Sequence, residues 1–192
     1  MNSEFLLNKT QVQKFQKPWD HYVIENFLPH DEFAQVQKAL CKVEDGFHQR
    51  DDDPFELNFK FLPNLDLAKF FLSPDFQKFL ERTTGKNLEI YPGGLVQLRL
   101  MTPESPAMPP HVDDQDERSL VCLWYLSDWM EGRGGELNLL TSKTGHPSEG
   151  KIIAPVANRM VLFFSDDCNW HSVNKVENWK RYSVISEWIV KG

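Results

Sequence analysis

The sequence predicts an α+β protein that is mainly β: a double-stranded β-helix, or jelly roll, with an N-terminal layer of helices. Apolar residues recur at helical spacing up to about residue 86, whereas short apolar runs separated by glycine and proline follow it. Many short strands with turns between them are typical of a sandwich or barrel. No repeat, linker or low-complexity segment divides the 192 residues. We therefore expect one domain, 1–192, with the helical layer at about 1–86 and the jelly-roll core at about 87–190.

The N-terminal part is expected to contain one short strand and three helices. The strand is placed within 19–30, and the helices at 31–44, at 64–72 and from Ser73 to Gly85. Asp31 is a suitable N-cap for the first helix. Ser73 followed by Pro74 is a typical helix start, and Gly85 is a typical stop.

After Gly85 the pattern becomes that of a β protein. Strands are expected at 88–91, 95–101, 119–126, 136–140, 151–153 and 160–164, around His171, and at 182–190. Residues 102–110 contain four prolines and predict a rigid loop. Gly134-Gly135 predicts a hairpin turn that needs positive φ angles.

Composition excludes several classes of protein. The net charge is -7 and the pI about 5.4, so a phosphate backbone would be repelled and nucleic acid is not an expected partner. The N-terminus lacks a basic region followed by an apolar run, and the three cysteines are an odd number, so we expect reduced thiols and a cytoplasmic location. No apolar run approaches membrane-spanning length, so no membrane partner is expected.

The residues that suggest chemistry are His111 and Asp113. On an extended chain, residues two apart point to the same side, so both can reach one metal ion. His171 is the best candidate for a third ligand. Two histidines and one carboxylate leave open positions on the metal, an arrangement diagnostic of non-heme Fe(II) oxygenases.

Four segments in this order resemble the Fe(II)/2-oxoglutarate-dependent dioxygenases, in their prolyl-hydroxylase-like branch. They are His111-Val112-Asp113, the strand and hairpin of 121–126, Trp129 and 134–137, His171-Ser172-Val173, and Arg181-Tyr182-Ser183. The resemblance covers roughly 90–190. It implies Fe(II), 2-oxoglutarate as cosubstrate and O2, with ascorbate as an optional reductant. It also implies that Arg181 binds the far carboxylate of 2-oxoglutarate, with Tyr125 and Ser183 beside it. Arginine suits that role because its guanidinium is planar and always charged.

The resemblance implies hydroxylation of a C–H bond, with release of succinate and CO2. It leaves the substrate open among a free amino acid, peptidyl proline and another small molecule or peptide. The strand before His111 lacks the tyrosine that the oxygen-sensing prolyl hydroxylases carry there. Arg99, on this strand, lines the pocket or faces solvent. The acidic run Asp113–Glu117, together with 51–53, either favours a neutral or cationic substrate by lying at the pocket mouth or only keeps the protein soluble.

Two alternative functions are open. One is a cupin-like metal enzyme without 2-oxoglutarate, for which Arg181 would have no comparable use. The other is a binding protein in which the metal is incidental. The remaining histidines are interpreted as surface or capping residues, namely His21, His30, His48 and His146, and Cys168 as a buried thiol.

Overall fold

Two antiparallel β-sheets form the centre of the protein. The computed structural model describes residues 11–49, 58–91, 96–113 and 119–191. The larger sheet contains, in spatial order, β1 (Val12–Phe15), β2 (His21–Ile24), β10 (Met160–Phe164), β7 (Leu120–Tyr125), β12 (Arg181–Val190), β5 (Gln97–Met101) and β3 (Asn58–Phe61), and β4 (Leu88–Ile90) also pairs with β12. The smaller sheet contains, in order, β6 (Met108–His111), β11 (His171–Val173), β8 (Leu137–Leu139) and β9 (Lys151–Ile153).

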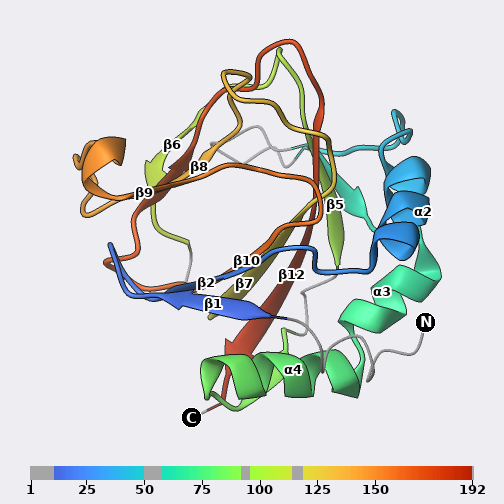
Figure 1. The fold of residues 1–192 in the computed structure, drawn as a ribbon, viewed down its shortest axis with the longest axis horizontal. Coiled ribbons are helices and arrows are strands. Elements are labelled where there is room, and N and C mark those ends of the chain that lie inside the picture. The colour runs from blue at the N-terminus through green and yellow to red at the C-terminus, as the bar shows by residue number, and fades with distance from the viewer. Residues whose placement is uncertain (1–10, 50–57, 92–95, 114–118, 192) are drawn as a thin grey trace.

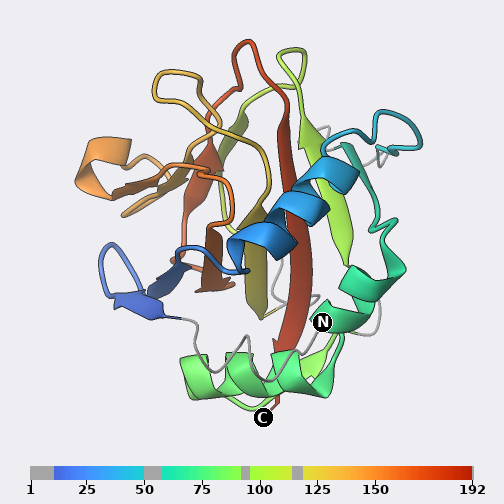
Figure 2. The same cartoon turned by 45° about the vertical axis from the view of Figure 1, so that its right-hand side comes forward.

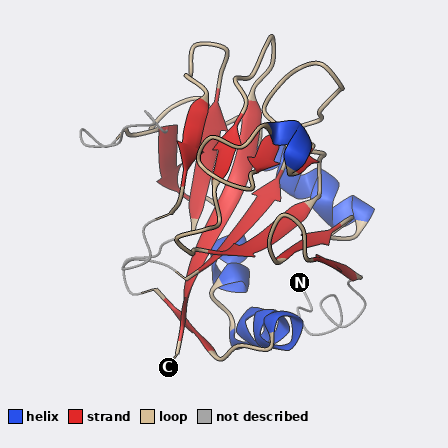
Figure 3. Cartoon of the chain, turned by 90° about the vertical axis from the view of Figure 1, so that its left-hand side faces the viewer, coloured by secondary structure: helices blue, strands red, loops and turns tan. Residues whose placement is uncertain are grey.

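The helices cover one side of the larger sheet. They are α2 (His30–Leu40), α3 (Leu65–Phe71) and α4 (Pro74–Thr84), and a short 3-10 helix, η1 (Pro147–Glu149), precedes β9. Figure 1 shows β6, β8 and β9 on the side of the molecule away from α2, α3 and α4. When the chain is coloured by secondary structure, the strands occupy the centre and these helices lie beside them (Figure 3). This is the predicted double-stranded β-helix with a helical layer on one side.

Strand alternation divides the interior into two cores. On β7, Trp124 faces the helices, where its ring lies 5.6–5.8 Å from those of Phe27, Phe33 and Phe71. Its neighbour Tyr125 faces the smaller sheet. Because both faces of β7 are covered, all six residues of this strand are buried.

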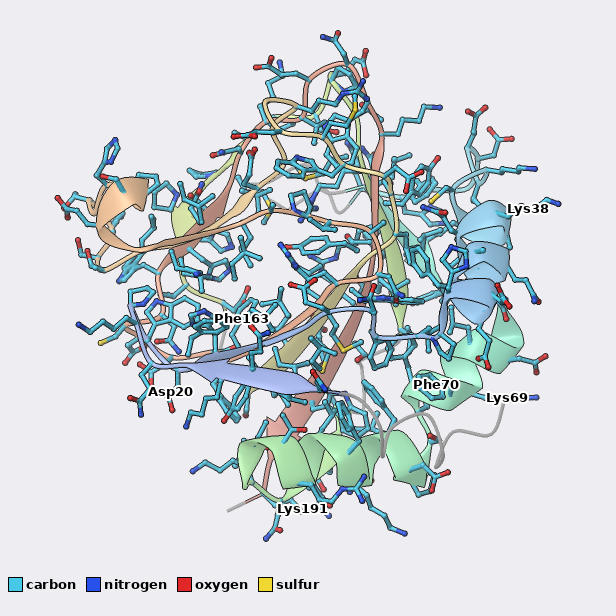
Figure 4. All side chains as sticks on the ribbon, in the orientation of Figure 1. Asp20, Lys38, Lys69, Phe70, Phe163 and Lys191 are labelled. Atoms are coloured by element: carbon cyan, nitrogen blue, oxygen red, sulfur yellow. The ribbon has the colours of Figure 1, made fainter. Side chains whose placement is uncertain are left out.

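Helix α2 is attached to the end of β7 by polar contacts as well as by packing. The Gln37 amide nitrogen donates to the Leu126 carbonyl at 2.8 Å and to the Asp128 carboxylate at 3.0 Å. In Figure 2 this helix lies across the larger sheet. Its outer face is polar, and Lys38 points away from the protein in Figure 4, as does Lys69 on α3.

The predicted boundaries agree with the structure for α4 but not for α2, which ends at Leu40 and not at residue 44. The Ser73 hydroxyl accepts from the Phe76 amide, and Gly85 ends α4 in the left-handed region with φ 71°. Asp31 is not the N-cap of α2, because the helix already begins at His30 and Pro29 precedes it. Asp31 instead lies in the first turn, where its charge complements the helix dipole.

The N-terminal part contributes strands as well as helices. β1, which pairs with β2, and β3, which pairs with β5, belong to the larger sheet and were not predicted. Sheet pairing thus joins residues 12–24 to 160–164 and residues 58–61 to 97–101. We propose on this basis that the chain forms a single domain.

The predicted proline-rich loop at 102–110 is wrong for its last residues. Met108–His111 forms β6, which includes Pro109 and Pro110. Proline cannot donate a backbone hydrogen bond, so it is tolerated on an edge strand. β6 is such an edge, and its pairing with β11 contains a register shift between His171 and Val173.

The turn before β8 has the positive φ angles that the sequence predicted. Gly134 has φ 72°, and a Cβ atom there would lie 1.9 Å from the Lys175 carbonyl oxygen. Gly132 also has a positive φ, 82°, but a Cβ atom there would meet nothing within 4 Å. Alanine at Gly132 would therefore cause backbone strain alone, whereas alanine at Gly134 would cause both backbone strain and a steric clash.

We expect Gly134→Ala to lower the free energy of unfolding by about 3 kcal/mol, because it combines left-handed strain with a backbone clash. Gly132→Ala, the control, is expected to cost about 1 kcal/mol, from strain alone. Urea unfolding of the two variants measures the difference. Equal losses would show that the chain next to Lys175 moves aside without cost.

Among the described residues, no helix is long and apolar enough to cross a membrane.

Candidate functional site

A pocket lies between the two sheets. About 570 Å³ of space between the atoms belongs to it, part of which is open solvent. Most of its wall is apolar and includes Phe163, which is labelled in Figure 4. Its polar and charged lining residues are Arg99, His111, Asp113, His171, Arg181 and Ser183. Five of the six candidate site residues therefore line one pocket, and the sixth, Tyr125, contacts Arg181.

The three candidate metal ligands converge at this pocket. His111 on β6 is directly opposite His171 on β11, and their ring centroids are 4.2 Å apart. Asp113 follows β6, and its Oδ2 is 3.7 Å from His171 Nε2. One ligand atom from each side chain lies within 4.8 Å of the other two. The three groups can therefore hold one ion, and their chemistry is that of a non-heme Fe(II) site.

Backbone contacts orient both imidazoles toward such an ion. His111 Nδ1 is 2.8 Å from the Pro109 carbonyl oxygen, and His171 Nδ1 is 3.0 Å from that of Asn169. A carbonyl only accepts, so Nδ1 must carry the proton in each ring, and Nε2 keeps its lone pair. This arrangement orients a metal-binding histidine and sets its tautomer.

Arg181 is a buried cation at another part of the pocket wall. Its side chain packs against Gly135, where a Cβ atom would lie 3.0 Å from Arg181 Cδ. The guanidinium lies 5.0 Å from the centre of the Tyr125 ring, and its Nη1 contacts Met101 Sδ at 3.4 Å. No carboxylate among the described residues forms an ion pair with Arg181. A buried cation with so weak a partner is suited to an anionic ligand.

Three buried polar atoms around Arg181 lack hydrogen-bond partners among the described residues. They are Arg181 Nε, the Tyr125 hydroxyl and the Ser183 hydroxyl. Tyr125 and Ser183 are directly opposite each other on β7 and β12. A buried polar group without a partner costs roughly 1–3 kcal/mol, so three together indicate a polar ligand. The residues present thus fit the far carboxylate of 2-oxoglutarate.

Burial also controls the ionisation of Tyr125. It raises the pKa of the Tyr125 hydroxyl above its usual value, and the positive charge of Arg181 opposes part of this rise. Tyr125 is therefore a neutral hydrogen-bond donor at physiological pH.

Arg99 lines the pocket. The sequence had left open whether this side chain lines the pocket or faces solvent. Its Nε and Nη2 each donate to Gln97 Oε1 at 3.3 Å, and Nη2 is 3.8 Å from Glu187 Oε1. Glu187 was missed by the sequence interpretation. The alternation of side chains along β12 could have shown that Glu187 lies on the same face of the strand as Arg181 and Ser183.

Two other interpretations of single residues are wrong. His21 is fully buried on β2, where it stacks on Phe15 with ring centroids 5.2 Å apart. Cys168 is exposed, although a buried thiol was expected. His30, His48 and His146 are exposed, as expected, and His146 caps η1. The acidic residues 51–53 and 114–117 lie outside the described residues.

Burial of His21 predicts an acid-sensitive fold. Burial is the main cause that lowers the pKa of His21 below 6.5, Lys151 adds to the lowering, and the Trp19 carbonyl and Asp20 oppose it. Below pH 6.5 the unfolded chain therefore takes up a proton that folded His21 resists, and the free energy of unfolding falls. The loss reaches at most about 1.4 kcal/mol per pH unit.

We expect His21→Phe, which keeps a ring stacked on Phe15, to lose less stability than the wild type between pH 7.5 and 5. Urea unfolding of both proteins in the presence of a chelator measures this difference. Parallel pH profiles for the two proteins would show that His21 is not responsible.

Comparison with known proteins identifies the family. A sequence model described as the 2OG-Fe(II) oxygenase superfamily matches residues 96–190, which include all six candidate site residues. A comparison with curated proteins found no match.

Several solved structures share the fold. A prolyl hydroxylase from Trichoplax adhaerens, in complex with a hypoxia inducible factor oxygen degradation domain peptide fragment, is 18% identical with a TM-score of 0.69, and the match covers 98% of this chain and 87% of that one. A Pseudomonas putida prolyl-4-hydroxylase is 15% identical with a TM-score of 0.66, covering 99% and 100%.

A third structure, a prolyl 4-hydroxylase from Phytophthora capsici, is 21% identical with a TM-score of 0.65. The match covers 88% of this chain but only 58% of the Phytophthora chain. At these identities the similarity concerns the fold, whereas the family assignment rests on the sequence match over the site. The chain belongs to the 2OG-Fe(II) oxygenase superfamily, whose members use Fe(II), 2-oxoglutarate and O2.

Proposed function

We propose that this oxygenase hydroxylates a C–H bond of a small-molecule or peptide substrate in the pocket between the two sheets. The observation that carries the proposal is the presence of two complementary groups in one pocket. His111, Asp113 and His171 converge on one point. Arg181, Tyr125 and Ser183 place unpartnered polar atoms at another.

In this proposal His111, Asp113 and His171 hold Fe(II). When iron and 2-oxoglutarate are bound, they supply oxidative decarboxylation coupled to C–H hydroxylation, with release of succinate and CO2. The protein's part is to bind and to orient. The carbonyls of Pro109 and Asn169 keep both imidazoles in the ligand tautomer.

Arg181 is proposed to bind the far carboxylate of 2-oxoglutarate, with Tyr125 and Ser183 as hydroxyl donors. Tyr125 is fully buried, and the guanidinium lies over its ring, so the donors are pre-organised before the ligand binds. The apolar wall formed by residues such as Leu123, Phe163 and Ile185 limits access of water to the reacting centre.

The arrangement around Arg181 favours this function over a cupin-like enzyme or a binding protein without 2-oxoglutarate. A metal site alone leaves the buried guanidinium and both hydroxyls without a role. A prolyl residue, another amino acid and another metabolite are all candidate substrates, since the similar solved structures share the fold alone. The three free cysteines support a cytoplasmic location.

The proposal is tested with purified protein loaded anaerobically with Fe(II). Calorimetry should detect 2-oxoglutarate binding that depends on the metal. Exposure to O2 should then give succinate and CO2 in equal amounts, faster when a substrate is present, and ascorbate should sustain turnover if it acts as reductant. Absence of 2-oxoglutarate binding in the Fe(II)-loaded protein would overturn the proposal in favour of the cupin-like alternative.

A further inference from the structure

Arg99 is a charged side chain in the pocket wall to which the proposed metal and cosubstrate sites give no role. Among the described residues, every other polar or charged side chain that lines this pocket is a proposed metal ligand or a proposed contact of 2-oxoglutarate. The Arg99 side chain is 17% exposed. A guanidinium that is largely removed from water needs charged or polar partners, and a ligand can be one of them.

Strand pairing locates the metal end of the pocket on the larger sheet. The Phe163 ring lies 5.1 Å from the ring of His171. Phe163 is paired with Val121, and Val121 with Glu187, so these three residues lie side by side on β10, β7 and β12. Arg181 is six residues before Glu187 on the same face of β12. The pocket wall therefore runs along the strands from Arg181 toward the level of Phe163, where His171 lies.

The Arg99 side chain extends toward this metal end. Its backbone is paired with that of Ser183, one of the proposed cosubstrate contacts. Its guanidinium reaches past this position, because Nε and Nη2 donate to Gln97 Oε1 at 3.3 Å and Nη2 is 3.8 Å from Glu187 Oε1. Both partners lie further along the sheet toward Phe163 than Ser183 does. The guanidinium is therefore at the end of the pocket where a substrate meets the metal.

Protein partners hold this guanidinium in place, and it can still serve a ligand. A guanidinium has five N–H donors, and Gln97 Oε1 accepts from two of them. The 3.8 Å between Arg99 and Glu187 is longer than a charge-assisted hydrogen bond, which is about 2.7–2.9 Å. Arg99 has further interactions as well, so a ligand would join partners that already orient it. Such pre-organisation lowers the cost of binding.

The rest of the wall at the metal end is apolar. Phe163, Val121 and Ile185 line the pocket from the larger sheet, and Met108 lines it from β6. Apolar walls bind hydrocarbon, and a few placed polar groups fix its orientation. The reacting carbon is therefore expected to belong to a hydrocarbon part of the substrate, with an oxygen acceptor nearby for Arg99.

We propose that Arg99 binds a carboxylate of the substrate, so that the substrate is a small carboxylic acid whose reacting carbon belongs to an apolar chain or ring. This inference rests on the proposed function and narrows its substrate class. A planar and permanently charged fork matches a carboxylate better than a single carbonyl oxygen. Free amino acids fall within this class. A peptide with both ends blocked and no acidic side chain does not.

A substrate panel tests the class. Succinate formation by the Fe(II)-loaded wild type is measured with free amino acids, aliphatic acids and arylalkanoic acids, each compared with its carboxamide. We expect at least one acid to stimulate succinate formation and to gain one oxygen atom, with a kcat/KM about 10-fold or more above that of its carboxamide. Stimulation by none of the acids, equal stimulation by an acid and its carboxamide, or stimulation only by an end-blocked peptide without acidic residues would overturn the proposal.

Variants of Arg99 test the residue. Arg99→Gln is expected to raise the KM for that acid about 30-fold or more, with a much smaller change for its carboxamide. Anaerobic calorimetry with the acid and with the carboxamide gives the two affinities without turnover. Arg99→Lys should keep part of the preference for the acid, because it keeps the charge but not the fork, and it supplies the comparison if Arg99→Gln does not fold. Equal losses for acid and carboxamide would show that Arg99 is merely structural.

The matched control is Arg159→Gln. Arg159 forms an ion pair with Glu25 at 2.7 Å and is 19% exposed, but it does not line the pocket. This variant should keep the wild-type preference for the acid over its carboxamide. An equal loss of that preference in Arg159→Gln and Arg99→Gln would contradict the assignment.

Binding of 2-oxoglutarate separates this inference from the proposed function. If the wild type does not bind 2-oxoglutarate, the proposed function fails first. If the wild type binds it and Arg99→Gln still prefers the acid as strongly as the wild type does, only the substrate assignment fails. A large loss of 2-oxoglutarate affinity in Arg99→Gln would place Arg99 in the cosubstrate site, and this result would also overturn the substrate assignment.

Discussion

Asp113→Ala is expected to abolish turnover and leave a folded protein. Asp113 supplies the only carboxylate of the proposed ligand set, and its Oδ2 lies 3.7 Å from His171 Nε2. Loss of a residue that merely orients a ligand typically costs 10–100-fold in metal affinity, so loss of a ligand should cost more than about 100-fold. His111→Ala and His171→Ala should have the same effect.

Two measurements check this prediction. Anaerobic calorimetry with Fe(II) gives the metal affinity, and succinate formation gives the turnover. Circular dichroism and urea unfolding establish that each variant is folded, since the two hydrophobic cores do not include the metal ligands. The controls are Asp31→Ala and His146→Ala, both at exposed positions. Turnover near the wild-type rate in Asp113→Ala would overturn the ligand assignment.

Arg181→Ala is expected to weaken 2-oxoglutarate binding by roughly 30- to several-thousand-fold, while Fe(II) binding changes little. Removing one partner of a buried charge pair typically costs ~2–5 kcal/mol. Arg181→Lys should lose less, because it keeps the charge but not the planar fork. Tyr125→Phe and Ser183→Ala each remove one hydrogen bond to a charged group, and about 10-fold is expected for each.

Thermal unfolding gives an independent reading of the same prediction. A ligand at about 100 times its Kd stabilises a protein by about 2.7 kcal/mol. The wild type and Arg159→Gln should show this stabilisation with 2-oxoglutarate, and Arg181→Ala should not. Without ligand, Arg181→Ala should not be strongly destabilised, because no carboxylate among the described residues forms an ion pair with Arg181. Unchanged 2-oxoglutarate affinity in Arg181→Ala would place the cosubstrate pocket elsewhere.

The differences between the predicted and observed strands have a common cause. Pro109 and Pro110 argue against a central strand, and the sequence does not show that β6 is an edge, where they are tolerated. β1 and β3 are four residues each and only partly buried, so their local pattern is weak. Their membership of the larger sheet depends on partners far away in the chain, such as β5 for β3.

The same reasoning applies to single side chains. His21 has no partner at metal spacing in the sequence, but its burial follows from the packing of Phe15, Trp19 and Phe163 around it. Arg99 could have faced either way, because alternation relates its direction to Gln97 and Met101 without showing which face is covered. Pairing with β12 settles its direction, since Ser183 is its partner across the strands.

The sequence by itself determined the mainly β class, the helix from Ser73 to Gly85, the candidate ligand set and the proposed cosubstrate arginine. The ligand pair depends on local spacing, two residues from His111 to Asp113, and the role of Arg181 is what the resemblance to the dioxygenase family implies. Tertiary structure alone decided that His111 lies opposite His171, that the hydroxyls near Arg181 lack partners, and that Arg99 meets Glu187. Local periodicity sets the direction of each side chain relative to its neighbours, whereas strand pairing and sheet packing set which distant side chains meet and which are removed from water.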